Sequence, residues 1–141
     1  MLKDTPAPFS RHDIRVYYED TDAGGVVYYA NYLKFFERGR TEWLRRLGVD
    51  QSDLATNGRR LFVVKNVEIQ YRKPARLDDQ LAIHSAISRL GHASIFFRQS
   101  ATRDGELLCQ SDTQVVCVDA DTFRPAPFTD ELKTLLEKAR K

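Results

Sequence analysis

One long amphipathic helix constrains this chain more than any other feature. From Asn31 onward the apolar residues recur at the spacing of an α-helix, and Gly48 follows the last of them, as is typical of a helix C-terminus. The predicted helix has about 17 residues and is therefore roughly 25 Å long at 1.5 Å per residue. Its apolar stripe consists of Tyr32, Leu33, Phe36, Trp43, Leu44 and Leu47. A helix of this length can serve as the spine of a small domain.

Gly39 lies in the middle of this helix. Glycine in a helix interior costs about 1 kcal/mol relative to alanine. We therefore expect another segment of backbone to pass close to the helix at this position.

An acidic, glycine-rich turn precedes the helix. The strand-like run that ends at Glu19 leads into Asp20-Thr21-Asp22-Ala23-Gly24-Gly25, and the helix begins within ten residues of it. The start of a helix offers unpaired N–H donors and a partial positive charge. A carboxylate that faces such donors can support acyl transfer, because the donors hold a carbonyl oxygen while the carboxylate attacks or activates water.

Length and composition indicate one domain over residues 1–141. The chain has 141 residues, 42% of them hydrophobic, and a net charge of +2, so nothing points to a nucleic-acid or membrane surface. Residues 1–8 contain two prolines and no apolar segment of the secretory type, so we expect a loose lead-in and a cytoplasmic protein. Cys109 and Cys117 should be reduced, because an extended strand would hold them about 26 Å apart.

The remaining segments predict an α+β fold with an antiparallel sheet. Strands are expected over Phe9–Tyr18 and Leu61–Tyr71, a short helix over Asp50–Thr56, and a final helix capped by Thr129 that ends at Arg140. Between them lie three strand-like runs, Leu81–Leu90, Ala93–Thr102 and Glu106–Val118. The economical packing lays the sheet around the long helix.

Two turns join these three runs into a meander. Gly91-His92 suits a type II′ hairpin, and Asp104-Gly105 suits type I′. In the resulting register Ile87 lies opposite Phe96 and Ala86 opposite Phe97. Both faces of the sheet then carry apolar residues, so we infer that part of the second face is also covered, which another subunit would explain.

Several kinds of site are excluded by the pattern of residues. The turn begins like a calcium loop, but Gly24 and Asn31 stand where side-chain ligands are required. The histidines and cysteines have no zinc-ligand spacing, and there is no G-x-S-x-G, G-x-G-x-x-G or P-loop. We therefore expect neither a metal nor a cofactor.

The residues alone leave the role of the turn open. Asp22 can cap backbone N–H groups or act in catalysis, and Asp20 has the more structural position. Aromatic residues near the helix start form either core or a substrate cleft: Tyr28, Tyr29, Tyr32, Phe35 and Phe36. Basic residues around Pro74 and beside the hairpin form either a solvated surface or a phosphate site: Arg72, Lys73, Arg76, Arg89 and His92.

Residues 15–48 carry a resemblance to a known family. The stretch follows the pattern D-x-D-x-x-G-x-V-x-[FY]-x-x-Y, and the similarity continues through FVVKNVEIQYRKPARLDD (62–79) and VVCVD (115–119). Over residues 10 to 127 the chain resembles the hotdog-fold acyl-CoA thioesterases. It is most similar to the YbgC type, which is associated with the Tol–Pal cell-envelope genes, and is related more distantly to 4-hydroxybenzoyl-CoA thioesterase.

The resemblance implies a fold and a site. It implies an antiparallel sheet of five to six strands wrapped around the long helix, and a homodimer or homotetramer with active sites at the interface. The catalytic carboxylate of the family corresponds to Asp22, and its oxyanion donor, a backbone N–H at the helix start, to Tyr29. YbgC-type members often have His where this chain has Tyr29. Arg89 and His92 are our candidates for binding the phosphates of coenzyme A.

Three functional hypotheses remain at this stage. The first is a hydrolase that cleaves short- to medium-chain or aromatic acyl-CoA thioesters. The second is a non-catalytic module that binds acyl thioesters or acyl carrier protein in cell-envelope lipid metabolism. Only the first requires the carboxylate of Asp22. The third is a hotdog dehydratase or isomerase, for which no suitable His–Glu or His–Asp pair is evident in the sequence.

Overall fold

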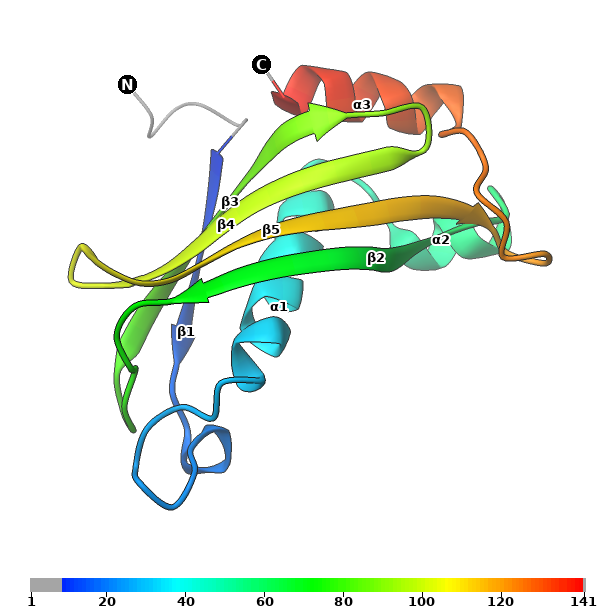
Figure 1. Ribbon diagram of the computed structural model, residues 1–141. Helices are drawn as coiled ribbons and strands as arrows, with labels where there is room; N and C mark the ends of the chain where they lie inside the picture. Colours follow the sequence, from blue (N-terminus) through cyan, green and yellow to red (C-terminus); the bar gives the residue numbers. More distant parts are fainter. Residues whose placement is uncertain (1–8, 141) are drawn as a thin grey trace.

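The computed structural model describes residues 9–140, apart from the side chains of Phe9 and Arg140. Within this range five strands form one antiparallel sheet in the order β1-β3-β4-β5-β2 (Figure 1). The elements are β1 (Phe9–Arg15), the 3-10 turn η2 (Tyr18–Asp20), α1 (Asn31–Arg46), α2 (Gln51–Thr56), β2 (Arg60–Tyr71), β3 (Gln80–Leu90), β4 (Ser94–Arg103), β5 (Glu106–Asp119) and α3 (Asp130–Arg140). The predicted lead-in over residues 1–8 lies outside the described residues.

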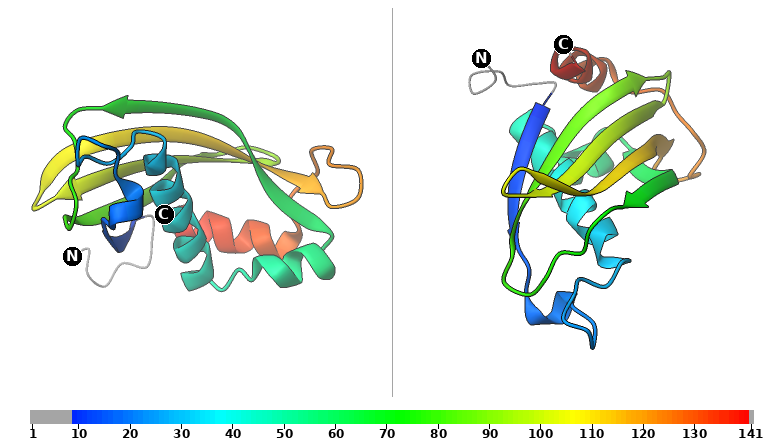
Figure 2. Two further views of the ribbon diagram at one scale, coloured as in Figure 1. Left: turned by 90° about the horizontal axis from the view of Figure 1, so that it is seen from below. Right: turned by 60° about the vertical axis from the view of Figure 1, so that its left-hand side comes forward.

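The sheet is strongly curved, and α1, α2 and α3 all lie on its concave side (Figure 2). Two clusters of buried side chains fill the space between the helices and the sheet. One gathers around Trp43, Phe97 and Leu136, and the other around Phe35, Ile83 and Leu108. This arrangement confirms the predicted α+β fold with a sheet wrapped around a central helix.

Helix α1 closely matches the prediction. It runs for 16 residues, and Gly48 follows it with a left-handed φ of 95°. Its buried face consists of Tyr32, Phe35, Phe36, Gly39, Trp43 and Leu44. Leu33 differs from the prediction, because 45% of its surface is exposed.

Gly39 lies directly against the sheet, and the lack of a side chain at this position lets the helix and the sheet come close together. A Cβ atom at this position would lie 2.7 Å from Cγ2 of Ile83, 3.1 Å from Oγ of Ser85 and 3.2 Å from Nε2 of Gln99. The neighbours are thus side chains of β3 and β4, whereas the sequence had suggested a neighbouring backbone. The absence of a side chain lets α1 settle directly onto the middle of the sheet.

The β3–β4 hairpin forms, but its predicted turn and register are wrong. The loop has three residues, and φ of Gly91 is not positive, which excludes a type II′ turn. A bulge between Ile87 and Arg89 shifts the pairing, so Ile87 lies opposite Phe97, and Arg89 lies opposite Phe96. The bulge and the longer loop are the physical cause of the one-residue error.

The turn between β4 and β5 is as predicted. Asp104 and Gly105 both have positive φ, 51° and 84°, which is the conformation of a type I′ turn. Strand β5 carries Cys109 and Cys117 as free, buried thiols, which confirms that the two do not pair. Burial raises the pKa of Cys109 to about 12.

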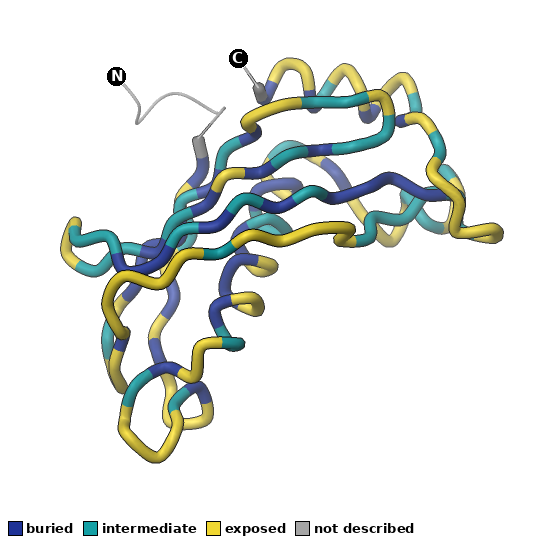
Figure 3. The backbone as a smooth tube through the Cα atoms, viewed as in Figure 1, coloured by how far each residue is buried: buried dark blue, intermediate teal, exposed yellow. Residues whose placement is uncertain are grey.

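Of the two edge strands, β2 matches the prediction to within one residue, whereas β1 is shorter than predicted. Strand β1 ends at Arg15 rather than Tyr18, which belongs to η2 and is 81% exposed. Strand β2 forms the opposite edge and is exposed along its middle (Figure 3). Its exposed residues include Val64 and Val67. Among residues 9–140 no helix is long and apolar enough to cross a membrane.

Candidate active site

The acidic turn is closed by backbone pairing at its base. Thr21 forms an isolated antiparallel bridge with Val27, and the N–H of Tyr28 donates to the carbonyl of Asp20 at 3.0 Å. At the tip, Gly25 adopts a φ of 79°, which a residue with a side chain rarely does. The turn therefore brings its acidic side chains back beside the start of α1.

The two aspartates of the turn have different surroundings. Asp20 is buried, and its carboxylate accepts a hydrogen bond from the N–H of Tyr17 at 2.9 Å. Its carbonyl also accepts from Nδ2 of Asn31 at 2.8 Å, which ties the turn to the first residue of α1. Asp20 thus has the structural role that its position in the sequence had suggested.

Asp22 is exposed at the other side of the turn. Its Oδ1 accepts a hydrogen bond from the N–H of Gly24 at 2.9 Å. Within residues 9–140 this is the only partner of the carboxylate, so Oδ2 remains accessible. Asp22 therefore caps a backbone N–H, which is one of the two roles that the sequence left open, and it uses only one of its two carboxylate oxygens to do so.

Tyr29 lies two residues before α1 and is 61% exposed. Its carbonyl accepts from the hydroxyl of Tyr71 at 3.1 Å and from the N–H of Tyr32 at 3.3 Å. Its own N–H donates to no acceptor in the described part of the chain. A free N–H at the start of a helix can receive a developing negative charge.

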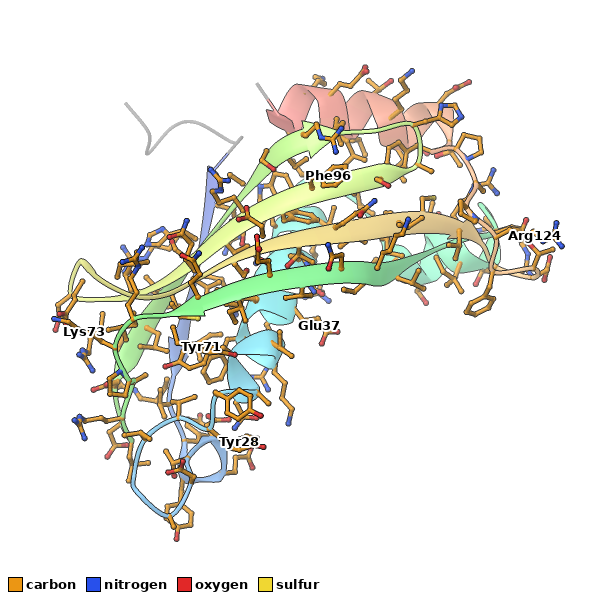
Figure 4. The ribbon with its side chains drawn as sticks, viewed as in Figure 1. Tyr28, Glu37, Tyr71, Lys73, Phe96 and Arg124 are labelled. Atoms are coloured by element: carbon orange, nitrogen blue, oxygen red, sulfur yellow. The ribbon has the colours of Figure 1, made fainter. Side chains whose placement is uncertain are left out.

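Aromatic rings surround Tyr29, and the structure divides them into two groups. Tyr32 is buried with Phe35 and Phe36, whereas Tyr28 and Tyr29 are exposed. The ring of Tyr71 lies 6.0 Å from that of Tyr29 and 5.6 Å from that of Tyr32. Figure 4 shows Tyr28 and Tyr71 beside the start of α1. Sequence reasoning did not place Tyr71 here, because β2 follows the turn by some distance along the chain.

A small cavity opens next to these rings. Its volume is about 240 Å³, and it is lined by Val27, Tyr29, Tyr32, Tyr71, Arg72, Lys73 and Pro74. Lys73 is paired with Glu106 at 2.5 Å. The structure therefore places Arg72 and Lys73 near the candidate site, while their role remains a prediction.

The loop after β2 holds the acidic turn in position. The buried Ala75 accepts a hydrogen bond from the N–H of Val27 at 2.8 Å, and its own N–H donates to the hydroxyl of Tyr32 at 3.1 Å. Burial raises the pKa of the Tyr32 hydroxyl, which therefore stays protonated at neutral pH. Ala75 thus joins the turn to helix α1.

An ion pair fixes the far side of this loop. Nη1 of Arg103 lies 2.7 Å from the carboxylate of Asp79, which also accepts from the N–H of Arg76 at 2.8 Å. Burial acts to raise the pKa of Asp79, but the hydrogen bonds from Arg76 and Arg103 outweigh it, so the pKa lies below its usual range. These contacts span distant segments, and the sequence pattern gave no sign of them.

One chain does not bring Arg89 and His92 to Asp22. They lie at the β3–β4 hairpin, where the guanidinium of Arg89 stacks over the ring of Phe96 at 4.0 Å. Strand β3 starts opposite Arg15, the end of the strand that leads to the acidic turn, and runs for 11 residues, so the hairpin lies about 33 Å along the strand from that end. A site that contains all three residues needs a second chain.

The described residues show which chemical groups the candidate site contains. Among residues 9–140 no group of three or more His, Cys, Asp or Glu side chains is placed to bind a metal ion. The chemistry present is an accessible carboxylate, an unpaired backbone N–H and a set of tyrosine rings. Together with an antiparallel sheet wrapped around one helix, this defines a hotdog-fold protein with a carboxylate-bearing turn at the helix N-terminus.

Comparisons with known proteins place the chain within a family. The model of the Thioesterase-like superfamily matches residues 16–136, and the chain belongs to this superfamily. It is similar to the acyl-CoA thioesterase YbgC of Haemophilus influenzae, with 46% identity over 120 residues that cover 85% of this chain and 88% of that protein. The acyl-CoA thioester hydrolase YbgC of Escherichia coli O6:H1 is 45% identical over 116 residues, which cover 82% and 86% of the two chains.

A solved structure agrees with this placement. A probable thioesterase from Bartonella henselae superimposes with a TM-score of 0.82 and 36% identity, and the match covers 86% of this chain and 99% of that one. The match confirms the hotdog fold that the sequence implied.

Proposed function

We propose that this protein hydrolyses acyl-CoA thioesters to a free acid and coenzyme A, with short- to medium-chain or aromatic acyl groups as substrates. The observation that carries the proposal is the accessible carboxylate of Asp22 on a turn that is tied to the start of α1. The activity in the names of the YbgC relatives supports the same reaction. No metal or cofactor is part of the proposed mechanism.

Asp22 would supply the reactive oxygen by one of two routes. In the first, its carboxylate attacks the carbonyl carbon, the C–S bond breaks, and water then hydrolyses the mixed anhydride. In the second, Asp22 takes a proton from water, and the resulting hydroxide attacks the same carbon. A thiol of pKa near 8.5 leaves readily as the thiolate, so neither route needs a strong general acid.

Tyr29 would stabilise the oxyanion through its backbone N–H. Removing one such donor costs about 3–4 kcal/mol in enzymes where this has been tested. The hydrogen bond from the Tyr71 hydroxyl holds Tyr29 in place without using this N–H. Because the backbone supplies the donor, Tyr can stand where relatives often have His.

A second copy of the chain would complete the site. The middle of edge strand β2 is exposed and carries Val64 and Val67, which suits pairing with another strand. Arg89 and His92 of a second copy would then bind the phosphates of coenzyme A. We expect a dimer or tetramer in dilute solution, and a monomer in analytical ultracentrifugation would contradict the shared site.

The cellular setting remains a prediction. The free thiols of Cys109 and Cys117 suit a cytoplasmic protein, and cell fractionation would test this location. Acyl carrier protein as an alternative carrier, and the association with Tol–Pal genes, derive from the resemblance alone.

The decisive test is thiol release from a panel of acyl-CoAs by wild type and Asp22→Asn. We expect the variant to lose about a hundredfold or more in kcat while its circular dichroism spectrum is unchanged. Asp22 is exposed, so the substitution should not disturb folding. Wild-type protein that binds acyl-CoA but releases no thiol would favour the non-catalytic binding module instead.

A further inference from the structure

A cavity of about 420 Å³ lies between α1 and the inner face of the sheet. Most of its wall is apolar, with Leu33 and Phe36 from the helix and Val64 and Phe97 from the strands. Arg40 also forms part of the wall, where a charged group is costly unless it has a partner.

Arg40 is incompletely paired within residues 9–140. Its Nη1 donates to Oε1 of Gln99 at 2.9 Å, and no carboxylate of residues 9–140 lies within 4.0 Å of its guanidinium. Burial lowers the pKa of Arg40, while the nearby charge of Glu37 opposes the shift. A guanidinium has five N–H donors in a planar fork, and most of these remain available here.

A buried polar platform holds Arg40 in this position. Gln99 is only 1% exposed, and its Nε2 donates to the carbonyl of Phe36 at 2.8 Å and to Oγ of Ser85 at 2.9 Å. These two bonds fix the orientation of the amide, so its oxygen must face Arg40. Gly39 permits the arrangement, because a Cβ atom there would crowd both Ser85 and Gln99. Such support is typical of a functional side chain that must not move.

The cavity runs along α1, the helix whose start lies next to Tyr29. Leu33 follows Tyr29 by four residues and so lies on the same side of the helix start. From Tyr29 to Arg40 the helix rises by about 16 Å, at 1.5 Å per residue. An acyl group whose carbonyl oxygen is held by the N–H of Tyr29, and whose chain enters the cavity, would therefore extend toward Arg40 with its far end.

From this geometry we propose that Arg40 binds a carboxylate at the far end of the acyl group, so that the preferred substrates are CoA monothioesters of medium-length dicarboxylic acids. The inference rests on the proposed thioesterase function. A carboxylate matches the guanidinium fork and would supply a directly paired anion, which residues 9–140 do not provide within 4.0 Å of Arg40. Glu37 also lines the cavity, but it is exposed, so water screens its repulsion of the ligand.

The test compares octanoyl-CoA with the CoA monothioester of octanedioic acid, which differ only at the far end. Wild type should show a kcat/KM about tenfold or more higher for octanedioyl-CoA, as expected from charge-assisted hydrogen bonds. Arg40→Met should lower the ratio of the two kcat/KM values by about the same factor. Arg38→Met is the matched control, since Arg38 is exposed on the same helix and should leave the ratio unchanged.

Each other outcome overturns the inference. If wild type hydrolyses both substrates equally, the carboxylate is not recognised, although the thioesterase function stands. If Arg40→Met keeps the preference, another residue provides it. If Arg40→Met slows both reactions equally and dissociates the oligomer, Arg40 pairs with a second copy instead. If Arg40→Met does not fold, calorimetry on wild type replaces it. Tighter binding of octanedioate than of octanoate would support the inference, and equal or weaker binding would overturn it.

Discussion

The hydrogen bond between Tyr32 and Ala75 allows a sharp test of what holds the candidate site in place. The Tyr32 hydroxyl is the only acceptor that the described chain offers to the N–H of Ala75, and both residues are buried, with Tyr32 3% exposed and Ala75 0%. Tyr32→Phe keeps the ring and its packing but leaves this N–H without a partner. A buried unsatisfied donor costs about 1–3 kcal/mol.

We therefore expect Tyr32→Phe to reduce the free energy of unfolding by about 2 kcal/mol, or about 4–8 °C in Tm. Urea denaturation at one fixed protein concentration measures this, with an unchanged m-value. Tyr71→Phe is the control. It also removes a hydroxyl that bonds to the backbone, but Tyr71 is 45% exposed and water can replace it, so the loss should stay below about 1 kcal/mol.

Hydrogen exchange locates the effect. The amide of Ala75 should exchange faster in Tyr32→Phe and remain protected in Tyr71→Phe. Equal stability losses in the two variants, or a Tyr32→Phe protein within about 0.5 kcal/mol of wild type, would refute the reasoning.

Three further predictions concern the helix–sheet contact, the ion pair and metal dependence. Gly39→Val should destabilise the fold by about 2 kcal/mol or more, because its side chain would overlap Ile83, and thermal melting would detect this. Since the pKa of Asp79 is lowered in the fold, its stabilising effect is present above its ordinary value of 3.8 and is lost as pH falls through the folded pKa. Arg103→Gln should thus destabilise the protein at pH 7 by about 1 kcal/mol, and the difference from wild type should shrink in urea titrations near pH 2. Thiol release should persist in EDTA, and inactivation that added metal reverses would overturn the proposed mechanism.

Local sequence signals predicted the parts of the fold that depend on local interactions. The span of α1 follows from its apolar period and from Gly48, and the turn at Asp104-Gly105 follows from the need for positive φ at both residues. The register of β3 and β4 was missed because a bulge after Ile87 leaves no mark in the alternation of residues. Tyr18 alternates like a strand residue, but the chain has already left the sheet at Arg15.

The candidate site was only partly predictable for a related reason. Asp22 and Tyr29 lie in one short motif, so the sequence could point to them directly. Tyr71 bonds to Tyr29 from β2, and Arg103 bonds from β4 to Asp79 in the loop that holds the turn, so both act through the tertiary fold. No spacing rule connects such distant positions, and only the packed structure reveals their contacts around the candidate site.

The order of strands in the sheet also bears on how the chain folds. Strands β3, β4 and β5 are consecutive and need only two short turns, so their contacts are local and can form early. Both edges close over long stretches of chain, since Phe9 pairs with Ala86 and Arg60 pairs with Asp119. We expect the central meander to nucleate folding and the edge strands to join late. Changes in the meander should then slow refolding, whereas changes in β1 or β2 should mainly accelerate unfolding.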